Sequence, residues 1–197
     1  MNSAPQASSR PLAFVSGGSR GLGFETARGL AAHGYDLALI AKDPARLNSA
    51  REQLLAEFSS TQTGLTISTH AADLESQEIT RQVAQEMIAS LPTPQVMVLA
   101  HGVMSEKMSK TLRTTDAEWN RVMSINLDSV FTLVNVLAPA MADARNGRLV
   151  IYSACLGRMS GPGNAGGLAP YRISKAGVNA LVRNLAHETG LGARGFY

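Results

Sequence analysis

Several protein classes are excluded by what the chain lacks. It contains a single cysteine, Cys155, so no disulfide can form within it. The formal net charge is only +3, and no run of Lys or Arg builds a patch for nucleic acid. No apolar stretch approaches membrane-spanning length, and residues 1–10 have no apolar core like that of a signal peptide. We therefore predict a cytoplasmic protein that binds neither nucleic acid nor a membrane.

The histidines are few and lack the spacing of metal ligands. His33, His70 and His187 are scattered along the chain, so we predict no metal site. The remaining composition, with 45% apolar and 17% charged residues in a chain of 197, is ordinary for a globular protein. We expect residues 1–10 to form a disordered polar tail and residues 11–197 to form one domain.

Short apolar runs alternate with longer amphipathic ones along this domain. The short runs predict strands at residues 12–16, 36–41, 65–71, 95–100 and 148–153. The longer runs predict helices at residues 21–33, 44–58, 75–90, 115–144 and 171–189, and Pro139 can break the fourth of these. Continuous apolar strands between helices imply a parallel sheet covered on both faces. We therefore predict an α/β fold with a three-layer, doubly wound, Rossmann-type sheet.

The last residues resemble the approach to a further strand. Residues 192–197 have the character of a turn into a sixth strand, which the sequence does not continue. A doubly wound sheet of this kind commonly has six strands. We therefore expect five evident strands and a sixth that is cut off, with one sheet edge and much of the substrate pocket missing.

A glycine-rich turn follows the first predicted strand. Gly17 suits the tight turn, Gly21 lets the backbone approach a pyrophosphate, and Gly23 permits close packing of helix on strand. Free N–H groups at the helix start can then bind the phosphates of a dinucleotide. The alternative is a glycine-rich turn that binds no ligand. The predicted cofactor-binding residues of this turn are Gly17, Ser19, Arg20, Gly21, Leu22 and Gly23.

Two basic residues favour NADP over NAD. Arg20 lies in the glycine-rich turn, and Lys42 follows the second strand, where an NAD site usually places a carboxylate. Two cations suit the 2′-phosphate of NADP, although Lys42 can equally be a solvated surface residue and Asp43 leaves NAD open. Asp73 and Leu74, after the third strand, are also predicted to bind the cofactor. The Asp73 carboxylate is expected to accept from the adenine amino group or to cap the next helix.

Tyr171 and Lys175 form the second motif. Their spacing places both side chains on one face of the predicted helix. A free phenol has a pKa of about 10, too high for efficient proton exchange near neutral pH. A neighbouring ammonium and a positive nicotinamide would lower that pKa. Alone, the pair can be a coincidence of surface residues. After a phosphate-binding turn and five predicted strands, it indicates proton transfer during hydride transfer at a carbonyl carbon.

The order of these motifs resembles the short-chain dehydrogenase/reductase family, of the single-domain, carbonyl-reductase-like type. The resemblance covers nearly the whole chain, from Leu12 to Tyr197. It rests on the glycine-rich turn, Asp73, the segment WNRVMSINL at residues 119–127 and the segment YRISKAGVNAL at residues 171–181. It implies that residues 11–197 form one dinucleotide-binding oxidoreductase domain, incomplete at its C-terminus. It also implies an NADP(H)-dependent oxidoreductase that transfers a hydride between nicotinamide and a ketone, an aldehyde or a secondary alcohol.

The resemblance also implies roles for single residues. Tyr171 is expected to act as the general acid and base and, like Lys175, to bind the cofactor. Lys175 is expected to tune Tyr171 and to hold the nicotinamide ribose. Asn126 is expected to hold a water that links Lys175 to solvent; the alternative is a buried asparagine satisfied by a neighbouring carbonyl. In relatives, the helices around residues 119–137 and after Tyr171 pair between subunits, which implies a homodimer or homotetramer. From the sequence alone, these apolar faces can simply cover the sheet.

The first departure from the family pattern follows the fourth strand. The family usually has Asn-Asn-Ala-Gly there, whereas this chain has Leu99, Ala100, His101 and Gly102. Both asparagines are absent, so the hydrogen bonds that they make near the adenosine must be made otherwise. We expect His101 and Gly102 to lie at the cofactor, with a purely structural role for His101 as the alternative.

The second departure concerns the family's substrate-orienting serine. Ala154 occupies that position, and Ser153 lies one step earlier. One step along a strand normally turns a side chain to the other face, although a bulge can restore it. Loss of one such donor typically costs about two to three orders of magnitude in rate. We nominate Ser153 as the orienting residue. The alternative is a catalytically weak or inactive nucleotide-binding or interaction protein of the same fold.

Overall fold

The computed structural model describes residues 10–106, 108–160, 166–193 and 195–197. Its strands are β1 (Leu12–Ser16), β2 (Asp36–Ala41), β3 (Ile67–Ala71), β4 (Val96–Leu99) and β5 (Arg148–Ile151). Its longer helices are α1 (Gly21–Ala32), α2 (Pro44–Phe58), α3 (Gln77–Ser90), α4 (Asp116–Met123), α5 (Ser129–Asp143) and α6 (Ala169–Glu188). Shorter turns are the 3₁₀ helices η1 (Thr111–Arg113) and η3 (Cys155–Gly157) and the π-helix η2 (Ser124–Asp128).

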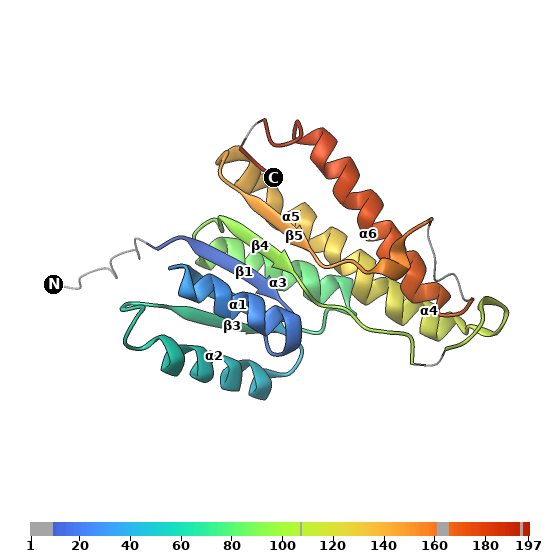
Figure 1. Ribbon diagram of the computed structural model, residues 1–197, viewed down its shortest axis with the longest axis horizontal. Coiled ribbons are helices and arrows are strands. Elements are labelled where there is room, and N and C mark those ends of the chain that lie inside the picture. Colours follow the sequence, from blue (N-terminus) through green and yellow to red (C-terminus); the bar gives the residue numbers. More distant parts are fainter. Residues whose placement is uncertain (1–9, 107, 161–165, 194) are drawn as a thin grey trace.

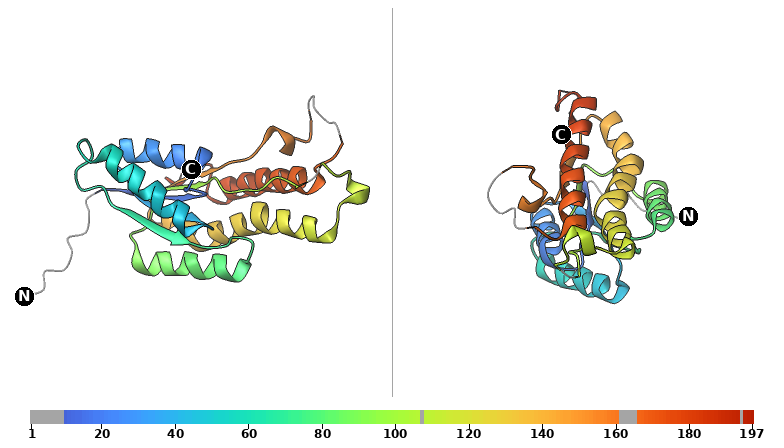
Figure 2. Two further views of the ribbon diagram at one scale, coloured as in Figure 1. Left: turned by 90° about the horizontal axis from the view of Figure 1, so that it is seen from below. Right: turned by 90° about the vertical axis from the view of Figure 1, so that its right-hand side faces the viewer.

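The strands form one parallel sheet in the order β3-β2-β1-β4-β5. Alternate residues of β1 point to opposite faces of the sheet and pack against different helices. Leu12 and Phe14 belong to a core cluster with α3, α5 and α6, whereas Ala13 and Val15 belong to a cluster with α1 and α2. The two helical layers lie on opposite faces of the sheet (Figures 1 and 2). The predicted three-layer, doubly wound α/β fold is confirmed.

The strand order reverses between β1 and β4, which are neighbours in the sheet but not in the sequence. Ligands of doubly wound sheets bind at such a reversal, outside the carboxyl ends of the strands. In this protein α4 and the first turns of α6 project beyond those ends (Figure 1). The fold therefore places the glycine-rich turn after β1 and the start of α6 at the same end of the sheet.

The long helix predicted over residues 115–144 is interrupted at a different place than expected. Pro139 lies inside α5 without ending it. The irregularity is η2, a π-helical turn between α4 and α5, and it contains Asn126. Because π turns often mark functional sites, this position is more informative than the proline.

The same helix corrects the expectation about apolar length. From Asp116 to Asp143 it runs for 28 residues and, by length and composition alone, is sufficient to cross a membrane. However, half of its most apolar window is buried inside the protein. Leu133, Leu137 and Met141 lie in the core cluster beneath the sheet, together with residues of α3. Its apolar composition is therefore accounted for by its place as a core helix.

The last residues of the chain begin to pair beside β5. Phe196 forms an isolated parallel bridge with Gly147. The N–H of Tyr197 donates to the Gly147 carbonyl at 3.0 Å, and the N–H of Leu149 donates to the Tyr197 carbonyl at 2.7 Å. Arg148 lies over the Tyr197 ring, 4.0 Å from its centroid. The expected approach to a sixth strand is thus present as one bridge at the β5 edge.

Arg10 belongs to the folded part rather than to the predicted tail. Its guanidinium pairs with the Asp36 carboxylate at 3.2 Å, and it donates to the Gln62 side chain at 3.0 Å. The other residues of that predicted tail, 1–9, lie outside the described part of the chain. Arg10 was assigned to the tail because it is hydrophilic and follows other polar residues. Its ion pair with Asp36, at the start of β2, cannot be recognised from the local sequence.

Candidate active site

The glycine-rich turn has the backbone geometry that its residue types imply. Gly17 has a φ of +71° and Gly21 a φ of +57°, a region that residues with a Cβ rarely adopt. A Cβ on Gly17 would lie 2.9 Å from the His101 backbone nitrogen, and one on Gly23 would lie 2.3 Å from the Gly17 carbonyl oxygen. The turn therefore brings β1, the start of α1 and the segment after β4 together as closely as glycine alone permits.

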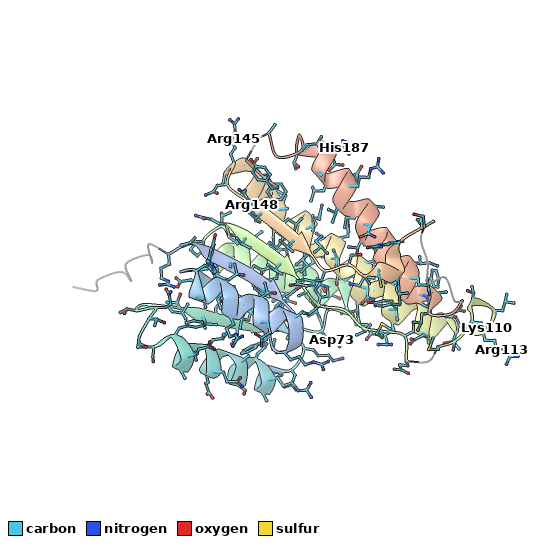
Figure 3. All side chains as sticks on the ribbon, viewed as in Figure 1. Asp73, Lys110, Arg113, Arg145, Arg148 and His187 are labelled. Atoms are coloured by element: carbon cyan, nitrogen blue, oxygen red, sulfur yellow. The ribbon has the colours of Figure 1, made fainter. Side chains whose placement is uncertain are left out.

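A cleft of about 690 Å³ lies over this turn at the carboxyl ends of the strands. Asp73, one of its lining residues, is labelled in Figure 3. Four of the predicted cofactor residues are not among the residues that line the cleft: Leu22, Gly23, Tyr171 and Lys175. Leu22 is 66% exposed on the first turn of α1, and Gly23 is buried. The predicted cofactor residues that do line it are Gly17, Ser19, Arg20, Gly21, Lys42, Asp73, Leu74, His101 and Gly102.

Sequence analysis missed Arg46, which lines the same cleft from the first turn of α2. Its side chain pairs with the Asp43 carboxylate at 3.2 Å. That carboxylate also accepts from the N–H groups of Ala45 and Arg46, so Asp43 serves as the N-cap of α2. Arg46 joins Arg20 and Lys42 as a third cation at this end of the cleft, where the carboxylates of Asp43 and Asp73 also line it. Arg46 lies in the first helical turn after β2, close to the carboxyl end of that strand, and this position could have indicated that it lines the cleft.

Lys42 and Asp73 form an ion pair at the cleft edge, with 2.6 Å between the ammonium and the carboxylate. Burial tends to raise the pKa of Asp73, but hydrogen bonds from Lys42 and from the Glu75 N–H outweigh it and hold that pKa below its usual value. The hydrogen bond to Asp73 in turn raises the pKa of Lys42. Asp73 therefore holds the Lys42 ammonium beside the cleft and also accepts from the Glu75 N–H in the turn before α3. The N-cap of α3 is Ser76, so the alternative that Asp73 caps this helix is wrong.

His101 has both ring nitrogens in hydrogen bonds. Nδ1 lies 2.5 Å from the Ser16 hydroxyl, and Nε2 lies 2.7 Å from the Ser129 hydroxyl. Ser129 donates its single hydrogen to the Ile125 carbonyl at 2.7 Å, so Nε2 must carry the ring proton and Ser16 must donate to Nδ1. The chain of bonds joins the end of β1 to the η2 turn. This is the structural role expected as the alternative for His101, although the residue also lines the cleft.

A pH dependence of stability follows from this histidine. Burial, together with the nearby Lys175 ammonium, lowers the pKa of His101 to about 4. The unfolded state, with a pKa of about 6.5, takes up a proton first as the pH falls. The neutral His101 ring therefore makes its full contribution to the free energy of unfolding above about pH 6.5. Between pH 6.5 and pH 4 that free energy falls by about 2 to 3 kcal/mol.

Urea unfolding at pH 7.5 and pH 4.5 measures this loss. The His101→Asn variant keeps polar groups at the site but has no titrating ring, so its loss of stability over the same range should be smaller. The half-buried His70, whose pKa is also lowered by burial, is present in both proteins, so its contribution cancels in the comparison. Equal losses in the two proteins would contradict the assignment.

Asn126 is fully buried, and its side-chain amide forms hydrogen bonds through both the oxygen and the nitrogen. Oδ1 accepts from the Val103 N–H at 2.8 Å, while Nδ2 donates to the Val103 carbonyl at 2.9 Å and to the Ser174 hydroxyl at 3.1 Å. Both hydrogens of Nδ2 are used, so this side chain has no donor left for the expected relay water. The side chain ties the segment after β4 to α6, as the alternative of a satisfied buried asparagine describes, and the relay-water role of Asn126 stays a prediction.

Lys175 lies inside the protein with only 5% of the residue exposed. Its ammonium donates to the carbonyl of Tyr152 at 2.8 Å, and burial lowers its pKa. A Cβ on Gly102 would lie 3.4 Å from this ammonium and 3.3 Å from Oδ1 of Asn126. Gly102, a cleft residue, thus connects the cleft directly to the buried end of Lys175.

Tyr171 is the third residue of α6 and is half-buried. The expected lowering of its pKa is wrong for the protein without cofactor. Burial of the phenol raises its pKa, and the Cys155 thiol nearby adds to this. The physical reason is that Lys175, although one helical turn away, directs its ammonium to the Tyr152 carbonyl.

The Ser153 hydroxyl donates to the carbonyl of Lys175 at 3.3 Å, so it lies against the backbone of α6. Ala154 follows in an extended conformation, with a φ of −150°. The contribution of Ser153 to substrate orientation stays a prediction. Residues 161–165, in the segment between β5 and α6, lie outside the described residues.

Comparisons with known proteins agree with this arrangement. Curated relatives include 3-oxoacyl-[acyl-carrier-protein] reductase of Chlamydia trachomatis, 28% identical over 90% of this chain and 67% of the relative. Another is a tropinone reductase homolog of Arabidopsis thaliana, 28% identical over 89% of this chain and 62% of the relative. The chain thus spans about two thirds of the length of these relatives.

Solved structures show the same fold. A metagenomic short-chain oxidoreductase in complex with NADP is 28% identical, with a TM-score of 0.81 over 94% of this chain and 78% of that chain. A blue fluorescent protein from a metagenomic library in complex with NADPH is also 28% identical, with a TM-score of 0.79 over 94% and 70%. The family model described as short chain dehydrogenase matches residues 11–191. The chain therefore belongs to the short-chain dehydrogenase family.

Proposed function

We propose that this protein is an NADP(H)-dependent oxidoreductase that interconverts a ketone or aldehyde with the corresponding alcohol. The observation that carries the proposal is the continuity at Gly102. This residue lines the phosphate-binding cleft and is also packed against Asn126 and the Lys175 ammonium. A dinucleotide that lies on the glycine-rich turn and extends past Gly102 therefore reaches the residues that can move a proton.

The residues of the cleft fit such a cofactor. Gly17 and Gly23 leave no room for a Cβ, and Gly21 faces open space in a conformation that favours glycine. The N–H groups at the start of α1 suit a pyrophosphate. Lys42 and Arg46 supply cations for a 2′-phosphate at the β2 side of the cleft, and structural neighbours of this chain are complexes with NADP or NADPH. When bound, the cofactor would supply or accept the hydride.

The chain's own residues supply the proton chemistry. Tyr171 would donate its phenolic proton to the carbonyl oxygen, or accept one from the alcohol in the opposite direction. The raised pKa keeps this phenol protonated near neutral pH in the free protein, which suits a proton donor. Lys175 would place a positive charge next to Gly102 and hold the ribose, while Asn126 fixes the segment after β4 against α6. Ser153 is the candidate for orienting the substrate oxygen.

Titration with NADPH, followed by its oxidation against a panel of ketones and aldehydes, tests the proposal. NADPH should bind and be consumed with at least one carbonyl compound. No binding would contradict the cofactor assignment, and binding without turnover on any compound would contradict the reaction.

A second candidate, a nucleotide-binding protein with little catalysis, is favoured by one observation. Ala154 occupies the position where relatives carry a serine, and the Ser153 hydroxyl is bound to the α6 backbone. Binding of NADPH without turnover, unimproved in an Ala154→Ser variant, would support this candidate. Turnover in the wild-type protein, or its appearance in that variant, would support the enzyme.

Cofactor selectivity should depend on the cationic end of the cleft. We expect Arg46→Gln and Lys42→Gln each to weaken NADPH binding about tenfold or more, the effect of losing one charged hydrogen bond. NADH binding should change little, since it has no phosphate at that position. Arg28→Gln serves as a control, because Arg28 pairs with Glu25 and is not among the lining residues of the cleft. Equal losses for NADPH and NADH would contradict the assignment.

The exposed apolar residues Phe131 on α5 and Val182 on α6 accord with the expected pairing of these helices between subunits. We include a homodimer or homotetramer in the proposal. Light scattering measures the mass of the protein in solution, and we expect the mass of a dimer or a tetramer. A monomer at all concentrations would contradict this part of the proposal.

A further inference from the structure

We propose that Tyr152 is a positioning residue that fixes the first turns of α1 relative to the Lys175 ammonium. It lies directly after β5, and nothing in its sequence context distinguished it. Through its phenol it contacts the helix that follows the phosphate-binding turn, and through its carbonyl it contacts Lys175. The inference rests on the proposed function for its catalytic consequence, but its structural part can be tested without a cofactor.

The phenol side of this link is a directed chain of hydrogen bonds. The Tyr152 hydroxyl lies 2.8 Å from the hydroxyl of Thr26, in the second turn of α1. Thr26 has a single hydroxyl hydrogen, and it donates this to the Leu22 carbonyl at 2.7 Å. Tyr152 must therefore be the donor to Thr26. The order Tyr152 to Thr26 to Leu22 leads to the first turn of α1, next to Gly21 and Gly23.

The backbone side of the same residue is equally constrained. The Tyr152 N–H donates to the Leu99 carbonyl at 2.9 Å, which extends the pairing of β5 with β4 by one residue. The Tyr152 carbonyl accepts from the Lys175 ammonium at 2.8 Å. Because that ammonium is buried, this carbonyl is an important partner for its charge. One residue thus holds both the helix of the phosphate turn and the cation beside the reacting groups.

This link has a consequence for cofactor binding. The N–H groups at the start of α1 bind phosphate best when they are already held in place, because the ordering cost then does not reduce the affinity. Thr26 and Tyr152 are 126 residues apart in sequence, so their hydrogen bond connects α1 to the residue that follows the edge strand β5. Without this hydrogen bond, only packing and the glycine-rich turn hold the first turns of α1 in position.

Packing by the tyrosine ring is the competing explanation. Tyr152 packs against the core cluster on the α1 and α2 face, as Phe24 and Ala100 also do. Tyr152→Phe keeps the ring and removes only the hydroxyl, so it separates the hydrogen bond from packing. Tyr35→Phe is the matched control: Tyr35 packs against the same cluster, and no hydrogen bond of its hydroxyl occurs among the described residues.

The first experiment measures hydrogen exchange in the free protein. In Tyr152→Phe the amides of residues 22–26 should exchange several-fold faster than in the wild type, whereas Tyr35→Phe leaves them unchanged. Thr26→Val should have the same effect as Tyr152→Phe, and the double variant should be no faster than the faster single one. Unchanged exchange in Tyr152→Phe, or additive effects in the double variant, would overturn the inference.

The second experiment measures the functional consequence. Tyr152→Phe should raise the Kd and KM for NADPH about 3- to 10-fold, as expected for one lost hydrogen bond, while kcat at saturating NADPH stays within about twofold. A merely destabilising change would instead lower the amount of active enzyme and leave KM unaltered. Equal NADPH affinity in Tyr152→Phe and wild type would overturn the functional part. If the wild type binds no NADPH, the proposed function fails, and the exchange experiment still decides whether Tyr152 holds α1.

Discussion

Replacing Tyr171 with phenylalanine is expected to lower kcat by about 10²- to 10⁴-fold, the contribution of a positioned general acid or base. The variant removes one hydroxyl from a half-buried side chain at the start of α6 and leaves the cleft walls intact. The Kd for NADPH should therefore stay within about twofold of the wild type, because the phosphate-binding turn, the cations of the cleft and Lys175 are unchanged. Turnover is measured by NADPH oxidation, and binding by fluorescence titration.

Tyr35→Phe provides the control for this result, since it removes a phenol hydroxyl from the opposite side of the fold. It should leave kcat unaltered. Wild-type turnover in the Tyr171 variant would show that the proton comes from another group, and the mechanism proposed here would have to be abandoned.

Gly23→Ala is expected to have the largest effect on the fold of the site. Its new Cβ would lie 2.3 Å from the Gly17 carbonyl oxygen and 2.7 Å from the Gly17 carbonyl carbon, both backbone atoms that cannot move without opening the turn. Overpacking of this kind costs about 2 kcal/mol or more. For a domain of this size, we expect the Tm to fall by roughly 5 to 10 °C. NADPH affinity should fall at least about tenfold, because the N–H groups of the turn lose their arrangement.

Gly29→Ala is the matched control within the same helix. A Cβ at Gly29 meets nothing within 4 Å, and alanine favours the helical state over glycine by about 1 kcal/mol. This variant should be slightly more stable than the wild type and bind NADPH equally well. A destabilised Gly29→Ala, or a Gly23→Ala variant with normal stability and binding, would contradict the account of the turn.

The centre of the sheet was predictable from the sequence because β1, β2 and β4 are short, apolar and buried on both faces, whereas the edge strands β3 and β5 are only partly buried. Residues 36–41 (DLALIA) show this, since five of the six are buried in β2, between β1 and β3. The glycine-rich turn was predictable for a related reason. Its constraints act within a few residues, as the contact of Gly23 with Gly17 shows.

Contacts between distant segments were not predictable. Arg46 and Tyr152 look like ordinary helix and strand residues, and their roles depend on what the fold places opposite them. The η2 turn was missed because a proline is visible in sequence, whereas a π turn depends on packing between α4, α5 and α6. Arg10 was assigned to a tail because its partner, Asp36, lies in another element.

The pKa of Tyr171 shows the same limit most clearly. Helical spacing correctly places Lys175 one turn from Tyr171, and the usual inference is that the ammonium favours the phenolate. Spacing gives neither the burial of the phenol nor the direction of the lysine side chain. In the folded protein Lys175 binds the Tyr152 carbonyl, so burial determines the shift and raises the pKa.

A crystal structure of the complex with NADP⁺ and a carbonyl substrate analogue tests the central claim most directly. We expect the pyrophosphate on the N–H groups at the start of α1 and the nicotinamide beyond Gly102. The Tyr171 hydroxyl should lie within about 3 to 3.5 Å of the analogue's oxygen, the separation of groups poised to react. A phenol that faces solvent, or a nicotinamide bound away from α6, would contradict it.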